Sequence, residues 1–137
     1  MFFHKSNAHY SNNALSINTI NALDNININK NIKLILIFSL EKCKPCNQLS
    51  SILDELFIAA ENQNQSLPLQ VIKFDYTHLH PSDQHNLEVF PTTIVFKPDV
   101  LEHIKDEQSL LQIGLSNGIV YKGQIQKLCD DHNLITF

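Results

Sequence analysis

A pair of cysteines at the end of an apolar run constrains this chain more than any other feature of its sequence. Residues 34–38 are continuously apolar, Cys43 and Cys46 follow with two residues between them, and a helical pattern begins directly afterwards. An apolar run this short is typical of a strand that is buried on both faces of a sheet. The sequence therefore predicts a buried strand that delivers both cysteines to the start of a helix.

The expected helix start gives the two thiols different chemistry. Unpaired backbone N–H groups and the positive end of the helix dipole favour the thiolate form of Cys43. Two intervening residues allow the pair to close into a small disulfide, so that the second thiol can resolve a mixed disulfide with a substrate. The motif predicts thiol–disulfide exchange, with Cys43 as the nucleophile and Cys46 as the resolving thiol.

Composition narrows the classes of function. The chain has 137 residues, of which 43% are hydrophobic, which suits one compact core better than two. All ten basic residues are lysines and the formal net charge is −4, so nucleic-acid binding is not expected. No uncharged apolar run approaches the ~20 residues that span a bilayer, and the polar N-terminal stretch lacks the apolar core of a signal peptide. We expect a cytoplasmic monomer that does not associate with membranes.

The first two thirds of the chain predict alternating helices and strands. Residues 1–13 are polar and without periodicity, so we expect a flexible arm followed by a single domain over 14–137. Ile17, Ile20 and Leu23 fall at helical spacing and predict a first helix. Next come a strand over 33–39, a long helix after the cysteines, a strand over 69–76, a short helix over 81–87 and a strand over 92–97. The long helix carries one apolar stripe, formed by Leu49, Ile52, Leu53, Leu56 and Ala60.

The last third is less regular. Residues 98–107 have the composition of an insertion with helical character, and residues 109–113 are expected to form a strand that Gly114 ends. A terminal helix is predicted to begin near residue 117 or 118, with Tyr121, Ile125, Leu128 and Cys129 on one face. Cys129 is expected to be a small buried hydrophobic residue.

These segments together resemble the thioredoxin superfamily. The resemblance lies in residues 34–38 before Cys43-Lys44-Pro45-Cys46, in the long helix, in residues 71–75, and in Phe90-Pro91-Thr92 leading into residues 94–97. It implies a three-layer α/β/α sandwich with a central mixed sheet. It also implies that Pro91 is cis beside the cysteines, that Phe90 offers backbone groups to an extended substrate, and that the dithiol carries electrons without an organic cofactor.

Several residues depart from the family pattern. Thioredoxins usually carry tryptophan and glycine around the first cysteine, where this chain has Lys42 and Lys44, and a buried aspartate where it has Ile37. Without that carboxylate the proton of Cys46 is expected to go to water or to Glu41. Lys42 and Lys44 favour the Cys43 thiolate and Glu41 opposes it. With Pro45 they form the set of residues expected to tune the dithiol, and we predict a Cys43 pKa below that of free cysteine.

The sequence favours a thiol–disulfide oxidoreductase acting on protein or small-molecule disulfides, with an unidentified redox partner that recycles it. One alternative is a binding adaptor that keeps the fold and its peptide-binding edge without redox turnover. Another is a zinc-binding module that uses both cysteines and two of the residues His78, His80 and His85. The sequence does not determine the direction of electron flow or the substrate.

Overall fold

A five-stranded mixed sheet lies at the centre of the part of the chain that the computed structural model describes, namely residues 14–17, 28–65, 67–78, 87–101 and 110–134. The strand order is β1-β3-β2-β4-β5. β3 runs parallel to both of its neighbours, whereas β4 runs antiparallel to β2 and to β5. The strands are β1 (Ala14–Ile17), β2 (Lys33–Ser39), β3 (Leu69–Asp75), β4 (Thr92–Phe96) and β5 (Ile119–Lys122).

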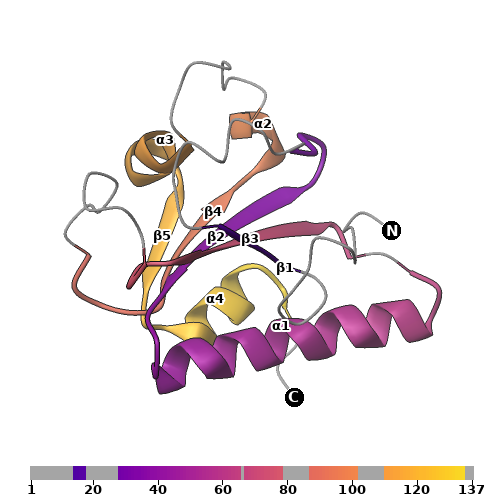
Figure 1. Ribbon diagram of the computed structural model, residues 1–137. Coiled ribbons are helices and arrows are strands. Elements are labelled where there is room, and N and C mark those ends of the chain that lie inside the picture. Colours follow the sequence, from indigo (N-terminus) through magenta and orange to yellow (C-terminus); the bar gives the residue numbers. More distant parts are fainter. Residues whose placement is uncertain (1–13, 18–27, 66, 79–86, 102–109, 135–137) are drawn as a thin grey trace.

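Helices cover both faces of the sheet (Figure 1). α1 (Lys44–Asn62) and α4 (Ile125–Asp131) lie on one face, and α2 (Pro98–Leu101) and α3 (Leu110–Asn117) lie on the other. This arrangement confirms the expected three-layer sandwich with a mixed sheet. The strands expected over 33–39, 69–76 and 92–97 and the long helix after the cysteines are likewise confirmed, to within one residue at the strand ends.

β2 explains why the core has two halves. Alternate side chains of a strand point to opposite faces, so a continuously apolar strand feeds both layers. Ile35 and Ile37 pack against the apolar stripe of α1 and against Leu128 of α4. Leu34, Leu36 and Phe38 join a second cluster that contains Leu101 of α2. Full burial of one such side chain contributes about 1.5–3 kcal/mol. β2 is therefore held firmly at the sheet centre, and its end fixes the position of Cys43.

The helix predicted from Ile17, Ile20 and Leu23 is wrong where it can be checked. Ala14–Ile17 forms strand β1, paired in parallel with Val71–Phe74 of β3. Four residues are too few to separate a helical from an alternating pattern, and the open edge of β3 decides for the strand. Residues 1–13, 18–27 and 79–86 lie outside the described part, and so do the predicted arm and most of the predicted helix over 81–87.

The predictions for the last third also need correction. The strand expected over 109–113 falls partly within helix α3, and Gly114 lies inside that helix. A Cβ atom on Gly114 would lie 2.6 Å from Cζ of Phe96, so the glycine allows α3 to approach β4 closely. Tyr121 belongs to strand β5, and the terminal helix begins only at Ile125. Within the described residues, no helix is long and apolar enough to cross a membrane.

Candidate active site at the start of helix α1

Cys43 and Cys46 are joined by a disulfide at the N-terminus of α1, with Cα atoms 5.2 Å apart. Cys43 is the N-cap residue, and its backbone is extended, with φ −97° and ψ 107°. Its Sγ accepts a hydrogen bond from the backbone N–H of Cys46 at 3.3 Å. Pro45 lies in the first turn, where a missing N–H costs nothing, and fixes the backbone between the two sulfurs. The predicted buried strand, short loop and helix start are therefore present.

The two cysteines differ in exposure. Cys43 is half-buried, whereas Cys46 is only 2% exposed. After reduction, a substrate can reach the first sulfur much more easily than the second. The N–H group that points at Sγ of Cys43 and the helix dipole both favour a thiolate there. The geometry suits attack by Cys43 and resolution by Cys46.

The residues predicted to tune the dithiol all lie on the surface around it. Glu41, Lys42, Lys44 and Pro45 are exposed, and Lys42 adopts a left-handed backbone conformation with φ 55°. Exposed charges act on a neighbouring thiol through solvent, so each one shifts its pKa only modestly. The four residues surround the half-buried Cys43 along the chain, and their roles stay predictions.

Glu41 makes contacts that the sequence did not reveal. His78 Nε2 lies 2.7 Å from Oε1 of Glu41 and 3.6 Å from Oδ2 of Asp75. The hydrogen bond to Glu41, followed by the charge of Asp75, raises the pKa of His78 above its ordinary value. Glu41 follows β2 and His78 follows β3, and the carboxyl ends of adjacent parallel strands meet at one edge of a sheet. Once the strand order is known, that rule brings this pair together.

The position of the missing carboxylate is apolar. Ile37 is 2% exposed and belongs to the core cluster beneath α1. Its register partner on β3 is Lys73, a half-buried residue that our reading of the sequence overlooked. Burial lowers the pKa of the Lys73 ammonium, and the carboxylates of Asp75 and Asp54 act in the opposite direction. Of these two paired residues, one is therefore apolar and the other is a cation, and neither is an acid.

Phe90 and Pro91 form the loop that enters β4. The peptide bond between them is cis. The Phe90 ring packs against Tyr76, with ring centroids 5.0 Å apart, and so its side chain serves packing. Within the residues described, neither backbone group of Phe90 has a hydrogen-bond partner. The Pro91 carbonyl accepts a bond of 2.8 Å from the N–H of Gly123, which ties the loop to the end of β5.

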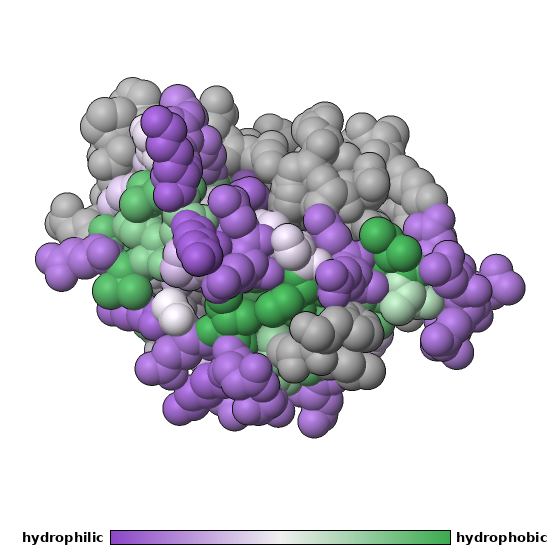
Figure 2. Space-filling view, turned by 90° about the horizontal axis from the view of Figure 1, so that it is seen from below, coloured by the Kyte–Doolittle hydropathy of each residue, from purple (hydrophilic) through white to green (hydrophobic). Residues whose placement is uncertain are grey.

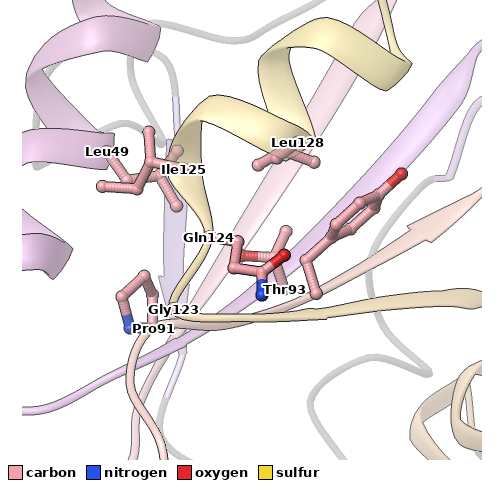
Figure 3. A pocket seen from close by; sticks show the side chains of 8 residues that line it. Leu49, Pro91, Thr93, Gly123, Gln124, Ile125 and Leu128 are labelled. Atoms are coloured by element: carbon pink, nitrogen blue, oxygen red, sulfur yellow. The ribbon is translucent and has the colours of Figure 1, made fainter.

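Two hollows lie near these segments. A narrow crevice runs between Pro91 and Gly123 on one side and Leu49, Ile125 and Leu128 on the other, and it is too small for a ligand (Figure 3). A larger open groove of about 570 Å³ lies between α1 and α4 and includes Lys44 at one end. Seen from the side of these helices, the surface is largely polar with apolar patches between the polar side chains (Figure 2).

The zinc hypothesis gains nothing from this geometry. In the oxidised form the two sulfurs are bonded to each other, so neither is available there as a thiolate ligand. His78 faces Glu41 and Asp75, and we treat these three residues as an exposed ion-pair cluster; His80 and His85 lie outside the described residues.

Cys129 is fully buried, which confirms its expected place in the core, and burial raises the pKa of its thiol.

The fold matches that of several solved thioredoxins. Trichomonas vaginalis thioredoxin matches with a TM-score of 0.56 and 18% identity, over 86% of this chain and 93% of that one. Trypanosoma brucei brucei thioredoxin matches with 0.53 and 15%, over 92% and 93% of the two chains. Mitochondrial thioredoxin 3 from Saccharomyces cerevisiae, in its oxidized form, matches with 0.51 and 18%, over 87% and 91%.

The comparison of sequences adds no closer relative. No protein-family model matches the chain, and no curated protein matches it in sequence. Identities this low show a common fold and leave activity to be argued from the site. The chain therefore has a thioredoxin-like fold with a Cys-x-x-Cys pair at the start of α1.

Proposed function

We propose that this chain is a thiol–disulfide oxidoreductase whose reacting groups are Cys43 and Cys46. The observation that carries the proposal is the disulfide at the start of α1, in which Cys43 is half-buried and Cys46 is only 2% exposed. A binding site alone does not require a pair of this kind. Exchange does require it, because one sulfur must meet the substrate while the other waits beneath it.

In the reducing direction the Cys43 thiolate attacks one sulfur of a substrate disulfide. The substrate S–S bond breaks, one substrate thiolate leaves and takes up a proton from water, and a mixed disulfide forms. The Cys46 thiol gives its proton to water, and its thiolate attacks Sγ of Cys43 and breaks the mixed disulfide. This step releases the second substrate thiol and leaves the Cys43–Cys46 disulfide, so two electrons have passed to the substrate. Oxidation of a dithiol substrate runs through the same steps in reverse.

The substrate edge is proposed to be the Phe90-Pro91 loop. The backbone of Phe90 has no partner among the described residues, and an extended peptide can add to such a backbone edge like another strand. We propose protein disulfides as substrates and a separate protein that restores the dithiol. The cytoplasmic location remains a prediction, and it fits a cysteine pair that works in a reducing compartment.

The test is disulfide reduction by the wild type and by Cys43→Ser and Cys46→Ser. The substrate is a model protein with reducible disulfides, and a chemical dithiol restores the reduced protein. We expect Cys43→Ser to lose essentially all activity. We expect Cys46→Ser to accumulate a mixed disulfide, visible by mass as one substrate molecule held by Cys43. Cys129→Ser is the matched control, because it removes a thiol that the fold buries completely.

Equal activity in all four proteins would end the proposal. A wild type that binds unfolded or extended peptides without any exchange, whose binding survives both active-site substitutions, would instead support the adaptor alternative.

A further inference from the structure

The ion-pair cluster of Glu41, Asp75 and His78 lies beside the dithiol in the chain and has no part in the exchange steps above. Glu41 is two residues before Cys43, in the loop that leaves β2. The carboxylate of Glu41 is 2.7 Å from Nε2 of His78, and the carboxylate of Asp75 is 3.6 Å from the same nitrogen. One histidine therefore faces two acids, and one of these acids is two residues before the nucleophile in the chain.

Bonds that do not depend on the histidine hold the two loops together. The backbone N–H of Glu41 donates to Oγ1 of Thr77 at 3.3 Å, and the N–H of Tyr76 donates to the carbonyl of Ser39 at 2.8 Å. The N–H of Thr77 donates to Oδ1 of Asp75 at 3.1 Å. None of these bonds involves the His78 ring. Loss of the His78 proton therefore changes the charge next to Glu41 without removing any of them.

The charges around Cys43 make that change matter. Lys42 and Lys44 flank Cys43 in the chain and favour its thiolate, whereas Glu41 disfavours it. A protonated His78 offsets the charge of Glu41. Within the described residues, Glu41 and Asp75 are the charged groups that act on His78; His80, Asp83 and His85 follow it in the chain outside them.

We propose that His78 is a positioning residue for Cys43: by holding and neutralising Glu41 it supports the thiolate, and it withdraws that support when it loses its proton. The inference rests on the proposed function, in which the Cys43 thiolate is the attacking group. The hydrogen bond to Glu41 raises the pKa of His78 above 6.5. The support is therefore complete below about pH 6.5, and it is lost as the pH rises through the higher pKa of the folded protein.

The test compares reduced wild type with His78→Gln, Glu41→Gln and the double variant. Two quantities are measured from about pH 5.5 to about pH 9: the pKa of Cys43 from the ultraviolet absorbance of its thiolate, and its rate of alkylation by iodoacetamide. We expect His78→Gln to raise the apparent Cys43 pKa by about half a unit. In the acidic part of the range, this shift should slow alkylation about threefold. At the alkaline end the two proteins should react at the same rate.

The carboxylate supplies the double-mutant control. In the Glu41→Gln background, we expect His78→Gln to change the alkylation rate by much less than threefold, because the charge that the histidine offsets is gone. Glu55→Gln is the matched control, since Glu55 is an exposed carboxylate three turns along α1 from Cys43, and it should leave the rate unchanged.

A rate ratio between wild type and His78→Gln that is the same at every pH would overturn the inference, and so would additive effects of the two substitutions. A direct measurement guards against indirect effects of substitution: the His78 ring protons, followed by NMR, should titrate at a lower pH in Glu41→Gln than in wild type. These measurements follow one thiol and one ring in the reduced protein and need no turnover. A chain that fails to exchange disulfides can still pass them, so the two proposals fail separately.

Discussion

At the scale of single residues, Lys44 is the clearest test of how charge acts on the nucleophile. It follows Cys43 directly, it is exposed, and it lies at the first position of α1. We predict that Lys44→Gln raises the Cys43 pKa by about 0.3–0.5 unit, because the thiolate loses a nearby positive charge. At neutral pH this lowers the alkylation rate about two- to threefold, measured on the reduced protein.

The control for Lys44 is Lys127→Gln, which removes an exposed lysine from α4 and should leave the alkylation rate as it is. A Cys43 pKa at or above the ordinary ~8.5 of free cysteine in the wild type would contradict the electrostatic account altogether. Added salt offers a further check, because the difference between wild type and Lys44→Gln should shrink as exposed charges are screened.

At the scale of elements, Gly114 decides how closely α3 packs on the sheet. Its added Cβ would lie 2.6 Å from Cζ of Phe96 and 2.7 Å from Cγ2 of Ile94, closer than real side chains approach. Alanine gains about 1 kcal/mol of helix propensity over glycine, but overpacking a core costs about 1–3 kcal/mol. We predict that Gly114→Ala lowers the free energy of unfolding by up to about 2 kcal/mol, measured by urea denaturation.

Ser116→Ala is the matched helix control for Gly114. Ser116 is exposed on the same helix, so the substitution brings the propensity gain of alanine without the clash, and the stability should rise slightly or stay level. A stabilised Gly114→Ala protein would mean that α3 does not pack on Phe96 and Ile94 as described.

The sequence predicted those elements whose hydrophobic pattern is set by burial against the sheet. β2 is apolar on both faces, and α1 carries an apolar stripe at helical spacing. The sequence pattern of each segment therefore fits only one type of secondary structure. The edge strand β5 has only Tyr121 buried, which leaves no alternation to read. Gly114 is a helix breaker by local propensity, and only its close contact with β4 explains a helix there.

The same reasoning separates the parts of the candidate site. The cysteine pair is a local motif that the sequence alone located, and the resemblance to the thioredoxin superfamily pointed to the Phe90-Pro91 loop. The link between Glu41 and His78 spans 37 positions and depends on β2 and β3 being neighbours in the sheet, which spacing within one segment cannot show. Sites assembled from two strand ends become visible once the strand order is known.

At the scale of the whole molecule, two histidines give the stability opposite dependences on pH. His132 is 7% exposed, its Nε2 lies 3.0 Å from the hydroxyl of Tyr121, and burial lowers its pKa below 6.5. Its share of the stability is complete above about pH 6.5 and is lost as the pH falls through the lower pKa of the folded state. His78, with its raised pKa, contributes in the opposite sense, since its share is complete below about pH 6.5 and is lost on alkalinisation.

A pH profile of the wild type alone mixes these two terms, so the prediction concerns a difference between proteins. Between about pH 7.5 and about pH 5.5 the unfolded chain takes up a proton on His132 that the folded chain resists, and the free energy of unfolding should fall by at most about 1.4 kcal/mol per pH unit from this group. In His132→Phe, which keeps a ring against Tyr121 and leaves the Tyr121 bond to Asp131, this fall should disappear. Urea denaturation at both pH values measures it, and parallel losses in the two proteins would show that His132 does not sense acid.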